Sequence, residues 1–447
     1  MHSFKLKKGL DLPITGAPAL EIRNGNNISH AAVVASDYVD LKPRLLVQEG
    51  ETVGVGAPLF FHKDSPDVMM TAPVSGKVKA INRGARRVLI SVEIEVDADL
   101  AEPVDFSEVG DITTPEGLVE RLCASGLWTS FRTRPYSKIP DPATRPAAIF
   151  VTAMDSEPLA ADPEIVISDT GDAFVKGLEA IASLSEGKTW LCHKTGSAIP
   201  GSDLTSVEAA DFDGPHPAGL AGTHIHFLGA PRTEKMVWTI GYSDVIAIGR
   251  LIETGTYDPS RIIALAGPKC TNPGLIRTVS GASIPELIEG EVDTSTPLRL
   301  ISGSVLSGAQ AEGPSAYLGR YARQITVIEE DHKQIPMGWI RPMAEKFAYQ
   351  PVLGSAFTQK LYDLSSNLNG GRRAMVPLGT FEELMPQDYL PTQLLRSMLV
   401  MDTDQAQLLG VLELDEEDLG LVGFACPAKY EYGMALRDCL RKIEKEG

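Results

Sequence analysis

The densest group of side chains that could do chemistry lies in the run DFDGPHPAGLAGTHIHF. Its histidines, His216, His224 and His226, could supply imidazole ligands to a metal ion, with Asp211 or Asp213 as a carboxylate ligand. A strand with a period of two would also place His224 and His226 on one side without any functional reason. No further ligand follows at a spacing typical of metal sites. The run therefore favours a packed glycine-rich loop over a metal site.

The cysteines and hydroxyl residues show none of the spacings that are typical of clusters or covalent catalysis. The sequence has no C-x-x-C pair, no nucleophile elbow and no zinc-protease helix. We therefore expect reduced thiols, no catalytic residue and no metal site. The five cysteines are widely scattered: Cys123, Cys192, Cys270, Cys426 and Cys439.

Three basic stretches are further candidates for binding. The connector LWTSFRTRPYSKIPDP carries Arg132 and Arg134, and it is either a surface crossing or a phosphate or partner site. The turns at residues 83–87 and 370–373 are basic patches in an acidic protein. Each is either a solvated turn or a contact with a partner or a lipid headgroup.

The bulk composition limits the partners and the number of domains. A length of 447 residues suggests about three domains. The net charge of −18 argues against nucleic acid or a bare anionic membrane as the main partner. No apolar run reaches the roughly 18 residues that a membrane span needs, and the start MHSFKLKKGLDLP lacks the apolar core of a signal peptide. We expect a soluble, cytoplasmic, multidomain α/β protein.

The first unit, residues 1–100, is predicted to consist of short strands joined by tight turns, centred on residues 45–78. The halves VQEGETVGVGAPL and TAPVSGKV resemble the barrel-sandwich fold of biotinyl and lipoyl carrier domains. Those carriers have a modified lysine at the hairpin tip, and Ser65 occupies the corresponding position in this chain. Lys63 lies two residues away and lacks the flanking methionines, so we expect the fold without the carrier chemistry.

The second unit, residues 101–257, alternates between strand and helix patterns. AAIFVTA, EIVIS and TWLCH read as buried strands, and helices are expected at 114–125, 170–184 and 243–254. This alternation predicts a Rossmann-like layer with a parallel sheet. Ligands would bind after the strands, at Met154 to Pro158 or after Cys192. No glycine-rich phosphate loop follows these strands, so nucleotide binding is not supported.

The remaining chain is predicted to form two smaller units. In residues 258–335 the runs RIIALAG, LIRTV, LRLIS and ITVIEE resemble a β-grasp module of the soluble-ligand-binding type, and GSVLSGAQAEGPSAYLGR is a long loop that is either functional or a surface excursion. Residues 336–447 are predicted to be mostly helical from their apolar periodicity.

Many long segments in a fixed order resemble one family over nearly the whole chain. These segments include KKGLDLPITG, SGLWTSFRTRPYSK, AIFVTAMDSEPLA, FDGPHPAGLAGTHIHFL and GPSAYLGRY. They are similar to the A subunit of the sodium-translocating NADH:quinone reductase (the NqrA family). The architecture is more distantly similar to the C subunit of the Rnf complex and to the flavin subunit of respiratory complex I.

This chain lacks two cofactor-binding motifs of these distant relatives. Where the flavin subunit has a loop "G-R-G-G-A-G-F", residues 124–133 read ASGLWTSFRT with a single glycine. Where the Rnf subunit has two cluster motifs, only Cys426 before Pro427 remains, and one thiolate cannot hold a four-iron cluster. The helical unit would thus be a degenerate iron–sulfur scaffold.

The resemblance implies a peripheral subunit without a redox cofactor of its own, on the cytoplasmic face of the bacterial inner membrane. FAD, FMN, riboflavin and iron–sulfur centres would lie on the other subunits, and the membrane-embedded B subunit would be the chief partner. The complex passes electrons from NADH to ubiquinone and exports Na⁺. Donors for a quinone carbonyl are expected among His216, His224, His226, Arg132 and Arg134. The alternatives are a soluble NAD- or flavin-binding oxidoreductase and a ligand-binding module.

Overall fold

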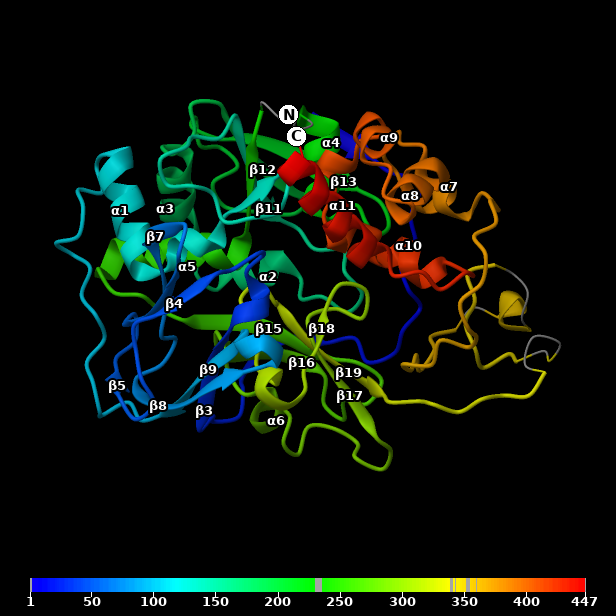
Figure 1. Cartoon of the computed structure of the whole chain (residues 1–447), viewed down its shortest axis with the longest axis horizontal. Helices are drawn as coiled ribbons and strands as arrows, with labels where there is room; N and C mark the ends of the chain where they lie inside the picture. The colour runs from blue at the N-terminus through cyan, green and yellow to red at the C-terminus, as the bar shows by residue number, and fades with distance from the viewer. Residues whose placement is uncertain are drawn as a thin grey trace.

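The computed structural model describes residues 2–229, 235–337, 341, 343–350, 354–358 and 360–446. Figure 1 shows the α/β unit with the sandwich and the β-grasp unit below it, and the C-terminal helices to one side. Within these described residues, no helix is both long and apolar enough to cross a bilayer. The four proposed units, 1–100, 101–257, 258–335 and 336–447, are joined by strands that cross between them.

The N-terminal unit is a sandwich of two antiparallel sheets, as the turn pattern predicts. The first sheet has the order β3-β9-β8-β5 and the second the order β4-β6-β7. Their inner faces share a core that contains Phe60, Met70 and Val92. The strands are β3 (His30–Val34), β4 (Pro43–Leu45), β5 (Thr52–Val53), β6 (Pro58–His62), β7 (Ser65–Thr71), β8 (Gly76–Arg83) and β9 (Leu89–Val96).

The second unit contains a six-stranded sheet with the order β1-β13-β12-β11-β14-β10. All of its pairs are parallel except β10 with β14. Counted along the second unit, β13-β12-β11-β14 has the order 3-2-1-4 of a doubly wound fold, so the sheet is Rossmann-like. The strands are β1 (His2–Lys5), β10 (Arg132–Arg134), β11 (Ala148–Ala153), β12 (Lys188–Lys194), β13 (Glu208–Asp213) and β14 (Val237–Gly241).

The helices of this unit begin and end largely where local signals place them. In α1 (Pro115–Ser125), the Thr114 hydroxyl accepts a hydrogen bond from the Gly117 N–H, and Gly126 ends the helix in the left-handed region. The helix α3 (Gly171–Ala182) packs beside α5 (Tyr242–Thr254), which Gly255 ends in the same way.

The prediction of a strand at EIVIS is wrong, because Pro163–Ser168 form the helix α2. The Asp162 side chain accepts a hydrogen bond from the Glu164 N–H, and Pro163 occupies the first helical position. These helix-start signals outweigh the β-branched residues of the run. The sheet uses β13 in place of the expected strand.

The third unit is a mixed sheet with the order β18-β17-β19-β15-β16-β2. Its first strand in the chain, β2, comes from the N-terminal segment and pairs in parallel with β16. Together with β1, it ties the first residues of the chain to two other units. The elements are β2 (Ala19–Asn24), β15 (Ser260–Ala266), β16 (Gly274–Val279), α6 (Ile284–Leu287), β17 (Leu298–Ser302), β18 (Ala309–Gln310) and β19 (Gln324–Glu329).

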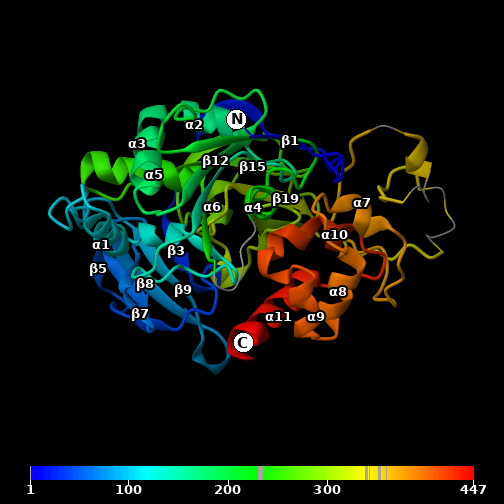
Figure 2. The same ribbon diagram turned by 90° about the horizontal axis from the view of Figure 1, so that it is seen from above.

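From Thr380 onwards the C-terminal unit is helical, as predicted, and it has its own apolar core, which includes Leu394, Leu395, Leu436 and Leu440. For the earlier part of the unit the prediction is wrong, because the described residues between 336 and 379 form no α-helix. Figure 2 shows these helices packed against the edge of the other units. They are α7 (Thr380–Leu384), α8 (Pro391–Leu399), α9 (Thr403–Leu408), α10 (Gly420–Ala425) and α11 (Tyr432–Glu446), with the 3₁₀ turns η7 (Val411–Glu413) and η8 (Glu416–Leu419).

Candidate functional site

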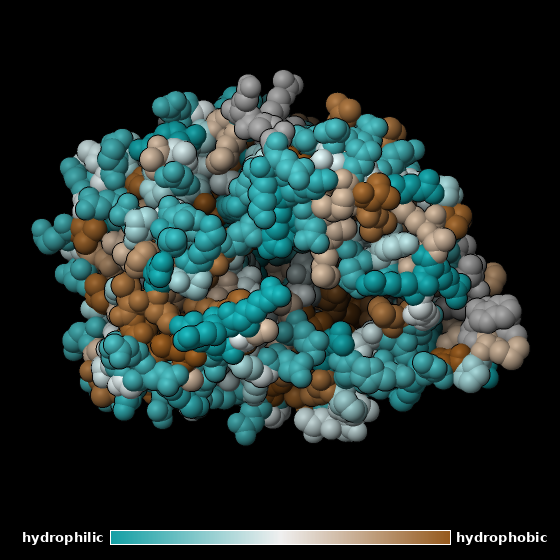
Figure 3. Space-filling view, in the orientation of Figure 1, coloured by the Kyte–Doolittle hydropathy of each residue, from teal (hydrophilic) through white to brown (hydrophobic). Residues whose placement is uncertain are grey.

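A cavity of about 390 Å³ lies where the α/β sheet, the β-grasp unit and the C-terminal helices meet. Its floor comes from the residues that follow β11 and β14, the two strands between which the strand order reverses. This is where doubly wound sheets bind ligands. Figure 3 shows the surface hollowed between the C-terminal helices and the β-grasp unit. The volume lies within the range of small-molecule sites.

Two carboxylates after β11 form part of the floor, in one of the two loops that the sequence predicts as ligand loops. Asp155 pairs with Arg323 at 2.9 Å. Glu157 accepts a hydrogen bond from the Ser307 hydroxyl at 2.7 Å, while its other oxygen is buried without a partner among the described residues. Burial raises the pKa of Glu157 to about 7, and the charge of Asp155 adds to that shift. Glu157 therefore titrates near neutral pH.

The loop that contains Ser307 belongs to GSVLSGAQAEGPSAYLGR, and its residues 303–304 and 307–310 line the cavity. That this loop is functional stays a prediction, which its place at the cavity supports. The second predicted ligand loop, after Cys192, does not contribute to the lining. Its His193 is buried and packs near Asp211 instead.

A second ion-pair cluster holds the β-grasp unit on the α/β unit. Asp244 accepts hydrogen bonds from Arg261 at 2.8 Å and from Arg320 at 2.6 Å. Arg320 also donates to the hydroxyls of Thr129 and Ser130. Burial alone would raise the pKa of Asp244, but the two guanidinium groups hold it below its usual range. The carboxylate is therefore charged, and its Oδ1 atom accepts from both guanidinium groups.

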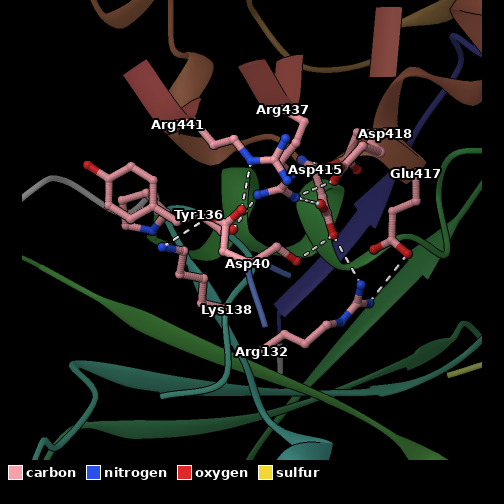
Figure 4. A network of polar contacts seen from close by, with 12 residues as sticks. Asp40, Arg132, Tyr136, Lys138, Asp415, Glu417, Asp418, Arg437 and Arg441 are labelled. Atoms are coloured by element: carbon pink, nitrogen blue, oxygen red, sulfur yellow. Dashed lines mark hydrogen bonds and ion pairs between the residues drawn. The ribbon is translucent and has the colours of Figure 1, made fainter. Parts of the chain in front are cut away.

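Asp415, just before η8, is the centre of the network drawn in Figure 4. It lies 3.1 Å from Arg132, 3.0 Å from Arg134 and 3.2 Å from Arg437, and it accepts a hydrogen bond from Ser137 at 2.8 Å. Burial would raise its pKa, yet the three guanidinium groups hold the pKa of Asp415 well below its usual range. Asp415 thus joins the C-terminal unit to the arginine-rich connector.

The same network reaches the sandwich unit (Figure 4). Lys138 lies 3.3 Å from Asp40 and 2.6 Å from Glu444, and Arg441 lies 2.8 Å from Asp40. Arg437 donates to the Tyr136 carbonyl at 2.6 Å. The network therefore connects three of the four units through α11.

Of the five residues proposed from the sequence as quinone donors, Arg132 alone lines the cavity. Its guanidinium group lies 5.0 Å from the centre of the Tyr321 ring. Arg134 lies behind it, fully buried against Asp415 and Glu417. The structure therefore brings the two arginines together, and carboxylates occupy much of their hydrogen-bonding capacity.

The three histidines lie outside the cavity lining and do not form one site. His216 Nδ1 lies 3.1 Å from the Ser156 hydroxyl, and His224 Nε2 donates to the Ala218 carbonyl. Burial lowers the pKa of His216 to about 4 and that of His224 to about 3, so both are neutral at physiological pH. His224 stacks obliquely on Phe212.

The expectation that His224 and His226 share one side of a strand is wrong, because both lie on the helix α4 (Ala221–Gly229). A separation of two residues on a helix of period 3.6 directs side chains to different sides. His226 therefore contacts the C-terminal unit, with Glu413 at 2.8 Å. Although burial lowers it, the hydrogen bond and charge of Glu413 raise the pKa of His226 above its usual value.

Sequence reasoning missed the carboxylates that organise the site. Asp415 and Glu417 lie nearly 300 residues after Arg132 in the sequence, and Arg323 lies 168 residues after Asp155. No spacing rule connects such pairs. The two signals in the sequence were the position after β11 and the glycine- and serine-rich loop, and both mark the cavity.

Residues 124–133, which the resemblance aligns with a flavin loop, do not form a phosphate cradle. Trp128 and Phe131 are fully buried and pack against Trp238. Gly126 packs closely on Thr71, whose hydroxyl would lie 2.5 Å from an added Cβ. The loop backbone is thus covered by bulky side chains, and these residues do not fit a flavin phosphate.

The described residues do not fit an iron–sulfur cluster either. Cys426 is buried, and its Sγ lies 3.2 Å from the Tyr432 hydroxyl. Across the described part of the chain, no three His, Cys, Asp or Glu side chains group in a way that could hold a metal ion. The remaining cysteines are likewise free thiols.

Three family models match the chain, each over a separate range. They are described as the NqrA N-terminal barrel-sandwich hybrid domain (residues 4–97), the NqrA second alpha/beta domain (113–257) and the NQRA C-terminal domain (262–313). A solved NAD⁺-reducing [NiFe]-hydrogenase has a TM-score of 0.40 at 10% identity, over 75% of this chain and 62% of that chain. That likeness is too low to bear on function.

Curated relatives match over the full length. The chain is 50% identical to the A subunit of the Na(+)-translocating NADH-quinone reductase of Rhodopirellula baltica, over 99% of this chain and 98% of the relative. It is 49% identical to that of Yersinia pestis, over 99% and 100%. It is 48% identical to that of Vibrio parahaemolyticus, over 99% of both chains. The chain therefore belongs to the NqrA family, the A subunits of the Na⁺-translocating NADH-quinone reductase.

Proposed function

We propose that this chain is a peripheral subunit of a respiratory Na⁺-translocating NADH:ubiquinone reductase and supports electron transfer from NADH to ubiquinone that is coupled to Na⁺ export. The observation that carries this proposal is the full-length identity of about half with relatives named for that subunit. The chain would lie on the cytoplasmic face of the inner membrane, held chiefly by the membrane-embedded B subunit. Deleting its gene should abolish NADH-driven Na⁺ uptake in inverted vesicles, and plasmid-borne wild-type chain should restore it.

The chain is proposed to carry no redox cofactor of its own. The covered loop around Trp128 and the hydrogen-bonded Cys426 support this view, because neither segment presents the groups that a flavin phosphate or a cluster needs. FAD, FMN, riboflavin and iron–sulfur centres would belong to other subunits. A visible spectrum of the purified chain should show no absorption band. Stoichiometric flavin or iron–sulfur bands would contradict the proposal.

A contribution to the quinone site would depend on Arg132. This residue reaches the cavity and could donate to a quinone carbonyl, whereas Arg134, His216, His224 and His226 would need to rearrange to do so. The lining is rich in charged and hydroxyl groups, and a quinone ring needs an apolar slot. Cross-linking with a photoreactive quinone tests the proposal. Labelling confined to membrane subunits would defeat it.

A ligand-binding module is the second candidate, and the cavity favours it over a nucleotide-dependent oxidoreductase. The turn after β11 carries Asp155 and Glu157 in place of the glycines that let a phosphate approach the backbone. Calorimetry with NADH should therefore show no micromolar binding to the isolated chain. A thermal-shift screen of polar metabolites would reveal a ligand of the cavity.

A further inference from the structure

Residues 360–379, here called the arm, are the most exposed apolar stretch of the described chain. Fifteen large apolar side chains are exposed among the described residues, and six of them lie between residues 337 and 378. Within the arm the exposed fractions are 61% for Leu361, 62% for Leu368, 54% for Val376 and 56% for Leu378. Such a concentration of exposed apolar side chains indicates a contact surface.

The arm is also basic in an acidic protein. Residues 360–379 contain three basic residues and one acidic residue, whereas the whole chain has a net charge of −18. The side chains of Arg372 and Arg373 form no ion pair or hydrogen bond with any described residue. A surface of this charge, next to apolar side chains, complements an acidic and apolar partner.

The arm forms no helix, and its backbone is hydrogen-bonded mainly in its first half. It is fixed at its start, where the Tyr362 N–H donates to the Pro13 carbonyl, and in its middle, where the Arg373 N–H donates to the Ala428 carbonyl. From residue 374 to 379, no backbone N–H donates a hydrogen bond to a described residue. Figures 1 and 2 both show this yellow-to-orange stretch at the periphery, beside α7.

These unpaired backbone groups distinguish a protein partner from a lipid surface. Apolar side chains on an irregular backbone cannot enter hydrocarbon without leaving N–H and C=O groups unsatisfied. A protein surface can pair them while it covers the side chains, as in recognition of an extended segment by an exposed strand. The excess negative charge of the rest of the chain also opposes an anionic bilayer.

We propose that the arm docks this chain on a membrane-embedded subunit of the complex, whose contacting face is apolar and acidic. This inference rests on the proposed function, because it assumes that the chain assembles with membrane subunits. Leu361, Leu368, Val376 and Leu378 would be covered on assembly, and Arg372 and Arg373 would face carboxylates of the partner.

The test uses the whole complex, purified in detergent through an affinity tag on a membrane-embedded subunit. One variant is Leu368→Ser/Val376→Ser/Leu378→Ser, and a second is Arg372→Glu/Arg373→Glu. The matched control is Arg44→Glu/Lys77→Glu, which reverses the charge of two exposed basic side chains of the sandwich unit. Because each buried apolar side chain contributes substantially to an interface, recovery of the apolar variant should fall by more than about tenfold. The charge variant should be lost at low salt, and the control should be retained.

Thermal melting of each isolated variant shows whether a loss of recovery is caused by unfolding. Because exposed side chains contribute little to stability, all variants should melt like the wild type. Full recovery and activity of both arm variants would overturn the inference. So would arm-dependent sedimentation with phosphatidylglycerol vesicles while recovery in the complex stays normal, since the partner would then be lipid. If the wild-type chain itself is not recovered with the membrane subunits, the proposed function fails, and the inference fails with it.

Discussion

Arg134 and Asp415 form an ion pair with an N···O distance of 3.0 Å, in which the arginine side chain is fully buried and the aspartate is 4% exposed. They come from the connector after α1 and from the loop before η8, so the contact joins units that are far apart in the sequence. Burial of two charges is costly unless each finds partners. Here Asp415 meets two further arginines, and it therefore fixes the C-terminal unit on the rim of the cavity.

Replacing Asp415 should strongly destabilise the protein. The variant Asp415→Asn leaves the buried Arg134 with only Glu417 as a charged partner, and loss of one member of such a pair costs about 3–5 kcal/mol. Chemical denaturation followed by circular dichroism measures the change. The control Arg145→Ala removes a pair with the 78% exposed Glu116, which should cost less than about 1 kcal/mol. Equal effects of the two substitutions would contradict this view of the network.

Glu157 should make stability depend on pH. Its pKa is raised to about 7 from the ordinary value of 4.5, so the folded state binds more protons than the unfolded state between these pH values. Its contribution to stability is therefore lost as the pH rises from about 4.5 to about 7. Glu157→Gln should be more stable than the wild type at pH 8 by about 1–3 kcal/mol, and the difference should vanish near pH 4.

Denaturation midpoints of the wild type and Glu157→Gln at several pH values isolate this effect from that of other titrating groups. The exposed Glu186 offers a control, because replacing an exposed side chain, as in Glu186→Gln, should change stability by less than about 0.5 kcal/mol. A difference between wild type and Glu157→Gln that is constant with pH would show that Glu157 does not titrate in this range.

Trp128 should be essential to the packing of residues 124–133. It is fully buried against Phe131 and Trp238, and its indole N–H donates to the Pro140 carbonyl. Trp128→Ala should cost about 3–5 kcal/mol of unfolding free energy, as large aromatic truncations do. Trp128→Phe keeps part of the packing and should cost less. If Trp128→Ala were neutral, this loop would not be the rigid layer that the structure describes.

Lys63 should remain unmodified. The pairing of His62 with Ser65 places Lys63 and Asp64 at the hairpin tip, and Asp64 pairs with Lys42 at 2.8 Å. Lys63 lacks the flanking methionines of a carrier lysine. Intact-mass measurement of the chain from its native host should show no covalent addition at Lys63. A mass increase equal to one biotinyl or lipoyl group would show that the carrier chemistry survives.

Local patterns predicted much of the fold, because their causes are local. Thr114, Pro115 and Gly126 supply the start and end of α1, and the turn residues of the N-terminal unit set the hairpins of the sandwich. Where two local signals compete, the sequence was misleading. The capping residue Asp162 overrode the β-branched run after it, and the helix α4 formed where alternating histidines indicated a strand.

The sequence by itself determined the family, the order of the units and two of the segments that line the cavity. Only the tertiary structure decided the site, because its charges belong to segments hundreds of residues apart. Asp415 meets Arg134 and Asp155 meets Arg323 through the packing of whole units. The same packing places the three histidines outside the cavity that Arg132 lines, although all of these residues were proposed together as quinone donors. Contacts between distant segments depend on the relative placement of folded units, which no spacing along the chain encodes.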